Sequence, residues 1–506
     1  MDEVIIVGAG PVGLMLACEL ALAGVRPTVL DKRPEISDLP RANGVGGQIV
    51  RMLDYRGLLE RFAEGSPFAG RPPGFPFGSV PLRFAGLDDI PLRMVMIQQP
   101  RMERLLSERA AELGVEVVRG TPVRGLTQDD DGVTLDLPGR RLRAHCAVGC
   151  DGGHSLVRER LGIAFPGTTD DEVLLLGHFR TGQVTGLFEQ SRVMGLEPGW
   201  NHTPHGRLLL TSLQPGVHIV GVREKGAAGP VTLAGFQAAI RRVIGADLPL
   251  GEPIWLSSTV TQARLAERYR SGRVFLAGDA AHLFPAGGSA LNVGLMDAVN
   301  LGWKLAAVLT GRAPVRLLDT YETERRPVGV RTLTHTRAQA ALERLTGEDG
   351  TALRDLLTEV FAFEQPARHL ANLLDGSDTR SGTPSKGAGE GVPAGEPGGG
   401  AGGVVAGGAA GRGGVVGADL VGRLVPDLQL STGDGPTRVA ELMRDGRPLL
   451  LDLGGGATLD GDWIRVVRAR CDDPPADTLL IRPDGQVAWT GTAGLREAAA
   501  EWLQSV

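Results

Sequence analysis

The chain has 506 residues, 42% of them hydrophobic and 22% charged, which is the ordinary composition of a folded protein with several domains. Its formal net charge of −6 argues against nucleic acid or an anionic membrane surface as the main partner. No apolar run reaches the length of a membrane span, no basic region precedes the first apolar strand, and the four cysteines show no metal-type spacing. These features predict a cytoplasmic protein with reduced thiols and no metal.

The first thirty residues predict a strand, a glycine turn, a helix and a second strand. The run EVIIVGAG ends in glycines, PVGLMLACELALAG has helical spacing, and RPTVLDKR contains an acidic residue at its strand end. Gly8, Gly10 and Gly13 have G-x-G-x-x-G spacing, and Asp31 follows 18 residues after Gly13. The first glycine permits a tight turn, the second lets a pyrophosphate approach the backbone, and the third lets helix and strand pack closely. The motif indicates a dinucleotide site but does not by itself separate NAD from FAD.

The middle of the chain changes from alternating elements to strands and then to helices. PRMERLLSERAAELGVEVVRG predicts an amphipathic helix followed by a strand. Residues 165–264 contain runs such as GRLLLTSL and GVHIVGVRE, which are typical of an antiparallel sheet. Helical patterns return after Ser289 and dominate to about Leu374.

The C-terminal part begins with a tract unlike the rest. Fifteen of the 31 residues from Gly387 to Gly417 are glycine, so this tract buries too little apolar surface to offset its ordering entropy. We therefore expect a disordered linker over residues 376–418. The runs RPLLLDLGG, WIRVVRARC and DTLLIRPDGQVAWTG then predict the strands of a small α/β module.

Two later motifs favour FAD over NAD. VGCDGGHSLVR places Asp151 after an apolar strand, with Arg158 nearby, and VFLAGDAAHLFPAGGSALN places Gly278 and Asp279 after another. A domain that binds only NAD needs neither motif. An extended FAD needs both, because its ribityl chain and ring leave the first site and require further polar groups.

With these three motifs in this order, the chain resembles the class A, single-component FAD-dependent aromatic hydroxylases of the para-hydroxybenzoate hydroxylase type, and above all the bacterial hydroxylases that tailor aromatic polyketides. The resemblance covers residues 1–374 and, more loosely, the C-terminal module. It implies an α/β fold in which a Rossmann-like FAD-binding domain is interleaved with an antiparallel-sheet substrate domain. A C-terminal thioredoxin-like module without a Cys-x-x-Cys pair follows. The expected parts are an FAD-binding domain (1–70, 100–164 and 265–330), a substrate-binding sheet domain (71–99 and 165–264), a helical segment (331–375), the Gly-rich linker (376–418) and the thioredoxin-like module (419–506).

The resemblance also implies a set of FAD-binding residues. The glycine motif would hold the pyrophosphate, Asp31 the adenosine ribose and Asp279 the ribityl hydroxyls. Gln99 fits the glutamine that meets the diphosphate–ribityl region better than Gln98 does, and Arg33 would either flank the ribose or remain solvated. The full expected set is Gly8, Gly10, Pro11, Val12, Gly13, Asp31, Lys32, Arg33, Arg41, Gln99, Val123, Asp151, Gly278, Asp279, Pro285, Gly287, Gly288, Leu291 and Asn292.

In this family NAD(P)H reduces the flavin, O2 reacts at its C4a carbon, and the resulting hydroperoxide transfers OH to an electron-rich ring. A helix that starts at about Leu291 would aim its positive end at the charge of the reduced flavin. Pro285 would shape the wall beside the ring, and Asn292 would add a side-chain contact. Because the cofactor performs the chemistry, no catalytic residue is assigned, and His282 is expected to pack or hydrogen-bond locally.

One local departure from the family concerns the pair Ser289-Ala290, which stands where many relatives have Gln-Gly. Replacing Gly by Ala requires a backbone conformation that tolerates a Cβ. Ala290 is therefore not expected among the close flavin contacts.

The leading hypothesis is an FAD- and NAD(P)H-dependent monooxygenase that hydroxylates an aromatic polyketide-like substrate. The same fold allows Baeyer–Villiger oxidation or inactivation of a rifampicin-type drug. A flavin dehydrogenase that does not use O2 and a non-catalytic flavin-binding partner in a biosynthetic complex are the alternatives from other classes. The expected partners are O2 and an apolar, polycyclic aromatic substrate, without nucleic acid or membrane, and a homodimer is left open.

Overall fold

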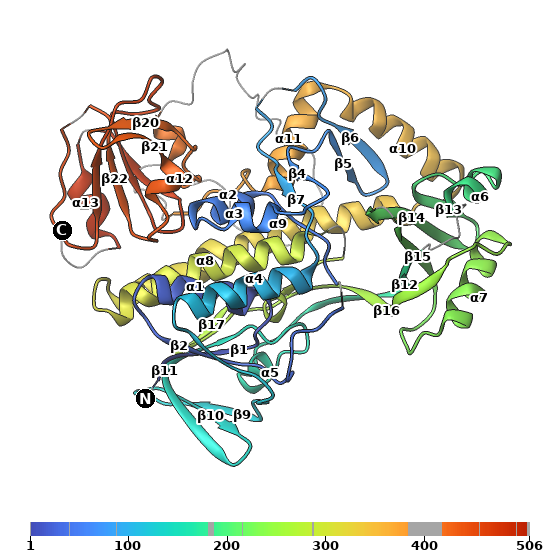
Figure 1. Ribbon diagram of the computed structural model, residues 1–506, viewed down its shortest axis with the longest axis horizontal. Coiled ribbons are helices and arrows are strands. Elements are labelled where there is room, and N and C mark those ends of the chain that lie inside the picture. The colour runs from blue at the N-terminus through green and yellow to red at the C-terminus, as the bar shows by residue number, and fades with distance from the viewer. Residues whose placement is uncertain are drawn as a thin grey trace, which may run out of the picture.

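The computed structural model describes residues 2–39, 41–87, 89–180, 187–214, 216–285, 288–382, 417–454, 456–491 and 493–502. Three bodies of secondary structure are visible in it: a sheet covered by long helices, a second sheet to one side, and a C-terminal module (Figure 1). Among these residues no helix has the length and apolar character needed to cross a membrane.

The first body is an eight-stranded sheet around β1 (Asp2–Val7). Its parallel core has the order β18-β11-β1-β2-β8, with ranges Val274–Leu276, Arg140–Gly149, Asp2–Val7, Pro27–Leu30 and Glu116–Val118. Antiparallel β17 (Arg270–Ser271), β10 (Val133–Leu137) and β9 (Gly125–Gln128) complete it. Helices cover the sheet, so the strands of its core read as nearly continuous apolar runs. The expected Rossmann-like arrangement is confirmed.

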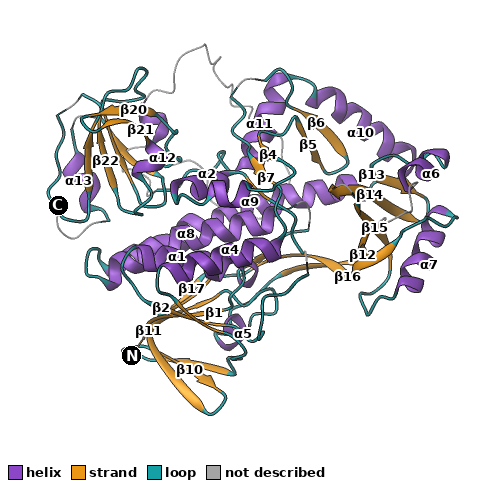
Figure 2. Ribbon diagram, viewed as in Figure 1, coloured by secondary structure: helices purple, strands orange, loops and turns teal. Residues whose placement is uncertain are grey.

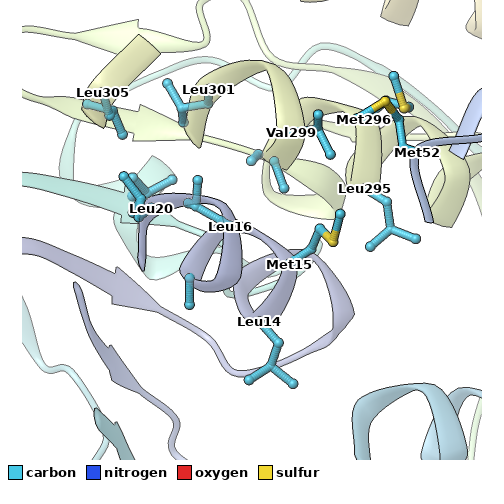
Figure 3. Packing of buried hydrophobic residues seen from close by; sticks show 14 of the residues in the cluster. Leu14, Met15, Leu16, Leu20, Met52, Leu295, Met296, Val299, Leu301 and Leu305 are labelled. Carbon is cyan, nitrogen blue, oxygen red and sulfur yellow. The ribbon is translucent and has the colours of Figure 1, made fainter. Parts of the chain in front are cut away.

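Three helices lie side by side on this sheet: α1 (Pro11–Leu22), α4 (Gln99–Glu112) and α8 (Ser289–Leu309) (Figures 1 and 2). Figure 3 shows Leu16 and Leu20 of α1 facing the buried side chains of α8. The two helices approach closely because Gly302 has no side chain, and a Cβ there would lie 2.6 Å from Glu19 Cβ. This contact joins the first thirty residues of the chain to a helix that begins at residue 289.

The second body is a six-stranded antiparallel sheet, which confirms the strand-rich prediction for this region. Helix α7 (Leu233–Ile244) covers it with a core of its own that includes Phe179 and Phe236. The strand order is β13 (Gly199–Thr203), β14 (Gly206–Gln214), β15 (Val217–Lys225), β12 (Gly167–Arg180), β16 (Glu252–Leu265) and β19 (His282–Leu283). The short helices of the first two bodies are α2 (Gln48–Tyr55), α3 (Leu59–Ala63), α5 (Leu156–Arg160) and α6 (Leu187–Val193).

Residues 71–99 were grouped with this sheet from the sequence, but the described residues of that range do not pair with it. β5 (Gly74–Phe77) and β6 (Val80–Arg83) form a separate hairpin, which shares a hydrophobic cluster with α11 (Glu364–Asp375). β7 (Met94–Val95) pairs with two short strands, β3 (Val45–Gly46) and β4 (Ala69–Gly70). Helices α9 (Asp319–Arg344) and α10 (Gly347–Phe361) complete this part of the molecule.

The third body is the C-terminal α/β module, in agreement with the predicted fold class. Its four-stranded sheet has the order β23 (Arg465–Arg468), β22 (Leu449–Asp452), β24 (Thr478–Ile481) and β25 (Val487–Thr490). A hairpin of β20 (Gln429–Thr432) and β21 (Gly435–Arg438), together with α12 (Val439–Leu442) and α13 (Leu495–Ala500), completes it.

The predicted linker lies mostly outside the described residues, which exclude 383–416. Its first residues follow α11 directly, where Gly376 N–H donates to Asn372 O at 2.9 Å. Ser381 N–H donates to Gly422 O at 2.8 Å, so the chain on the two sides of residues 383–416 meets at one place.

Candidate cofactor and substrate site

A cavity of about 1090 Å³ opens at the carboxyl ends of the parallel strands. Residues that directly follow β1, β2, β11 and β18 line it, which is where open α/β sheets bind their ligands. The predicted residues that line it are Gly8, Gly10, Pro11, Val12, Asp31, Lys32, Arg33, Arg41, Gln99, Val123, Asp151, Asp279, Gly288, Leu291 and Asn292. Gly13, Gly278 and Pro285 are not part of the wall, and Gly287 lies outside the described residues.

The glycine turn has the shape that a phosphate group requires. Gly8 has a φ of +109°, and a Cβ on Gly13 would collide with the Gly8 carbonyl oxygen. The space beside Gly10 is empty to 4 Å from a Cβ position, and no side chain caps the start of α1. The open space and the positive end of the helix together suit an anionic group.

Asp31 is an ionised acceptor at the edge of the cavity. Its carboxylate accepts hydrogen bonds of 2.7 Å from Ala9 N–H and from Arg33 N–H. Burial acts to raise the pKa of Asp31, but the hydrogen bonds from Arg33 and Ala9 outweigh it, so the pKa is lowered. Arg33 lies 3.3 Å from Asp31 and 3.5 Å from buried Glu103, so it is ion-paired rather than freely solvated.

Gln99, and not Gln98, lines the cavity. The Gln99 Nε2 group donates to Glu103 Oε1 at 2.8 Å, which orients the amide from one turn farther along α4. Glu103 also lines the cavity and was not anticipated, because in the sequence it is one of several charged residues in an amphipathic helix.

Asp151 and Arg158 connect two of the sequence motifs. Asp151 Oδ2 accepts Val157 N–H at 3.2 Å, whereas the buried Oδ1 has no hydrogen-bond partner in the described structure. Burial raises the pKa of Asp151. The Arg158 guanidinium donates to Gly153 O and to Ala280 O, both at 2.8 Å, and so joins the Asp151 loop to the Asp279 loop.

Asp279 lies in a 3₁₀ turn, Gly278–Ala280, separated by one residue from the end of β18. Its side chain is open to the cavity yet surrounded by protein, and this burial raises its pKa, with His282 and Arg41 acting in the opposite direction. The carboxylate is therefore placed to meet polar groups of a bound molecule.

The start of α8 corrects two details of the prediction. The helix begins at Ser289 rather than at about Leu291, after Gly288 with a φ of +70°. Ala290 lines the cavity from within the helix, where the backbone accepts a Cβ without strain, and this explains why Ala is tolerated there. Asn292 Oδ1 accepts Gly46 N–H at 3.0 Å and its Nδ2 donates to Gly288 O at 3.2 Å, so its side chain ties β3 to the helix start.

His282 is fully buried and makes the local contact expected for it. Its Nε2 lies 2.7 Å from Asp297 Oδ2, and its ring stacks on Phe284 with a centroid distance of 4.8 Å. Asp297 and its partner Arg325 were not anticipated. The signal available was an acidic residue inside the otherwise apolar helical run NVGLMDAVNL.

Another part of the wall is apolar and comes from distant segments. The residues are Phe75, Leu92, Met94, Met96 and Leu374. Among the described residues, none of the strands β12 to β16 contributes to this wall, although the sheet was expected to cover the site. Phe75 of the β5–β6 hairpin and Leu374 of α11 pack against the hydrophobic cluster that joins the hairpin to α11.

Comparisons with known proteins identify the same regions. An FAD binding domain family model matches residues 1–336, and a model of the aromatic-ring hydroxylase C-terminal domain matches residues 418–505. The 12-dehydrotetracycline 5-monooxygenase/anhydrotetracycline 6-monooxygenase of Streptomyces rimosus is 38% identical over 99% of this chain and 98% of its own. A rifampicin monooxygenase of Streptomyces venezuelae is 39% identical, covering 97% and 96%. The solved structure of the Diels-Alderase PyrE3 of the pyrroindomycin pathway superimposes with a TM-score of 0.83 and 34% identity, over the full length of both chains.

Proposed function

The chain belongs to the FAD-dependent aromatic-ring hydroxylases and is a monooxygenase that uses NAD(P)H, and from this premise we propose that it hydroxylates an aromatic polyketide-like substrate. One observation carries the proposal. A single large cavity joins the glycine turn and Asp31 to Asp279 and the start of α8, and it is bounded by an apolar wall.

The residues present fit FAD. The empty space at Gly10 and the uncapped start of α1 suit its pyrophosphate, and the carboxylate of Asp31 suits its ribose. The unpartnered Oδ1 of Asp151 is a buried acceptor that a ligand hydroxyl would satisfy, since buried polar atoms normally have partners. FAD, when bound, supplies electron transfer from NAD(P)H and the transfer of one oxygen atom from O2.

The protein's own residues bind, orient and exclude water. Asp279 would hold the ribityl chain, and the start of α8 would place its positive end against the ring, where it favours negative charge. Arg158 keeps the Asp151 and Asp279 loops together at a fixed spacing. None of these groups needs to exchange a proton with the substrate.

The apolar wall supports a polycyclic aromatic substrate. Phe75 and Leu92 provide rigid apolar surface, and Met94 and Met96 are flexible and polarisable groups that adapt to ring edges. Side chains of these types pack against ring faces and do not pair with an ionised group. We expect the reaction to take place in the cytoplasm, where NAD(P)H is available and where the four free cysteines would stay reduced.

The test is to measure NAD(P)H oxidation and O2 uptake by the purified yellow protein against a panel of polycyclic phenols and quinones, with mass detection of products. We expect O2 uptake that depends on substrate and a product one oxygen atom heavier with its ring count retained. NAD(P)H oxidation without O2 uptake would contradict the monooxygenase and favour a dehydrogenase. A lactone product would indicate Baeyer–Villiger oxidation, and a colourless protein that takes up no FAD would exclude every flavin-dependent function.

The apolar wall can be tested separately. Met96→Lys places a charge in the part of the cavity assigned to the substrate, so we expect the KM for the aromatic substrate to rise by about tenfold or more, as for an unpaired charge near apolar surface. The affinity for FAD should change little. As a control, Lys225→Met at the end of β15 alters a charge outside the cavity wall.

A further inference from the structure

A buried aspartate on α8 holds the chain on both sides of Asp279, through a backbone N–H before it and a histidine side chain after it. Asp297 Oδ2 accepts the N–H of Gly278, the residue before Asp279, at 3.2 Å. The same oxygen lies 2.7 Å from Nε2 of His282, three residues after Asp279. Asp297 is fully buried and does not line the cavity, so its influence on Asp279 is indirect and passes through this loop.

The second oxygen of Asp297 is held from α9. Arg325 Nε donates to Asp297 Oδ1 at 2.8 Å, and Arg325 Nη2 donates to Val293 O at 3.2 Å. Burial acts to raise the pKa of Asp297, but Arg325 and His282 outweigh it, so the pKa is lowered and the group is ionised. A carboxylate only accepts hydrogen bonds, so the proton between the two side chains resides on His282 Nε2.

A close contact between glycines brings the carboxylate within reach of the loop. Gly294 lies one turn before Asp297 on α8, and a Cβ on it would be 2.9 Å from Gly278 Cα. Residues three apart share a face of a helix, so Gly294 and Asp297 meet the loop together. A larger residue at 294 would push α8 away and lengthen the bond from Gly278 to Asp297.

From this geometry we propose that Asp297 is a positioning residue: its carboxylate sets the conformation of residues 278–282 and thereby the point at which Asp279 meets FAD. The inference rests on the proposed function, because it takes Asp279 as a ligand of the FAD ribityl chain. Since α8 also begins at the cavity, one helix then positions two separate parts of the cofactor site.

The test is a double-mutant cycle on the full-length protein, read as the FAD dissociation constant from flavin fluorescence. We expect Asp297→Asn to raise this constant roughly 10- to 100-fold, the range for loss of a charge-assisted buried hydrogen bond. Asp279→Asn should raise it as well. Because Asp297 acts through Asp279, adding Asp297→Asn to Asp279→Asn should raise the constant no further.

Asp452→Asn is the matched control. Asp452 is also a buried carboxylate that holds a loop, accepting N–H groups of Gly454 at 3.2 Å and Gly456 at 3.0 Å, but it lies in the C-terminal module. Its replacement should leave FAD affinity unchanged. If Asp297→Asn does not fold, as judged by circular dichroism, His282→Leu removes one of the three partners, and we expect a rise of about threefold that Asp279→Asn again abolishes.

The possible outcomes distinguish failure of the positioning role from failure of the proposed function. Multiplicative effects of the two substitutions, or no effect of Asp297→Asn or His282→Leu, would overturn the positioning role while leaving Asp279 as a ligand. No effect of Asp279→Asn would overturn the assignment of Asp279 in the proposed function and the inference with it. If Asp452→Asn lowered FAD affinity as much as Asp297→Asn does, the effect would be a general one of stability. That result would also overturn the positioning role.

Discussion

At the scale of single residues, the carboxylates around the cavity differ in what holds them. Asp31 has a lowered pKa because Arg33 and Ala9 donate hydrogen bonds to it. Asp151 and Asp279 have raised pKa values because burial is not fully offset by the groups around them. The first accepts hydrogen bonds from the protein, whereas the other two would gain from hydroxyl groups of a ligand. Under the proposed function, Asp31 would belong to a preformed part of the site and the other two carboxylates to parts that FAD would complete.

Another buried titratable group is His335 on α9. Its burial leads us to predict that the folded protein is less stable in acid. Burial lowers the pKa of His335 to about 4, with Asp378 acting to raise it and Arg331 to lower it. Between about pH 6.5 and 4 the unfolded chain binds this proton and the folded chain does not. Stability therefore falls as the pH drops through this window, by up to about 1.4 kcal/mol per pH unit.

We expect His335→Gln to weaken the dependence of the unfolding free energy on pH by the equivalent of about one bound proton. Urea unfolding at several pH values across the window measures this dependence. His205→Gln, which changes an exposed turn residue, is the control and should leave the slope as it is. An unchanged slope in His335→Gln would show that this side chain does not carry the acid sensitivity.

At the scale of secondary-structure elements, α8 is the helix that contacts several other parts of the site. It packs on α1 through Gly302, on the Asp279 loop through Gly294, and on α9 through the pair Asp297–Arg325. These contacts place its first residues at the cavity. A change on one face of α8 should therefore have an effect that depends on which neighbour it meets.

Gly294→Ala and Gly302→Ala separate these faces. Each added Cβ would be too close to a neighbour, 2.9 Å from Gly278 Cα at residue 294 and 2.6 Å from Glu19 Cβ at residue 302. We expect both variants to lose about 1–3 kcal/mol of stability through overpacking, offset in part by the higher helix propensity of Ala. Only Gly294→Ala should also weaken FAD binding, measured by flavin fluorescence. Equal losses of affinity in the two variants would contradict the special role of the loop contact.

At the scale of the whole molecule, the C-terminal module is docked by buried charges on α8 and α9. Arg482 donates to both carboxylate oxygens of Glu324 at 2.8 Å, and Lys304 Nζ lies 2.9 Å from the same carboxylate. Tyr55 Oη also donates to Val425 O at 2.6 Å, and the main hydrophobic core continues into the module. The module is therefore part of the same packed unit as the FAD-binding domain (Figure 1).

Arg482→Met should destabilise the protein by about 3–5 kcal/mol, because it removes the buried guanidinium that pairs with both Glu324 and Asp484. Arg496→Met, which removes an exposed pair with Asp460 on the same module, should change stability by less than about 1 kcal/mol. Denaturant unfolding of both variants checks this. A small effect of Arg482→Met would mean that the buried charges compensate one another without it.

Deleting residues 387–416 should leave FAD binding and stability almost unchanged. The described chain on either side meets at the bond between Ser381 and Gly422, so a short connection can replace the tract. Shortening a loop also lowers the entropic cost of closing it, although this cost depends only weakly on length. Flavin fluorescence and thermal unfolding of the deletion variant test this, and loss of FAD would show that the tract has a part in the site.

Several features of this protein were determined by the sequence alone, because each depends on residues close together in the chain. The glycine turn and its helix, the acidic residue at the end of β2 and the antiparallel character of residues 167–265 follow from local conformational preference and from apolar periodicity. The two later motifs could be recognised in the same way. Family resemblance then supplied the roles expected of these residues.

Only the tertiary structure decided which distant residues meet. Periodicity tells which face of a helix is buried but not what covers that face, so Asp297 could not be paired with Gly278 and His282 beforehand. Nor could Phe75 and Leu374 be placed on one wall. The side chain of Asn292, expected to contact the flavin, lies on the cavity wall and also bridges Gly46 N–H and Gly288 O, which satisfies two backbone groups. The local motifs thus identify the cofactor, whereas long-range packing sets the geometry in which it would be held.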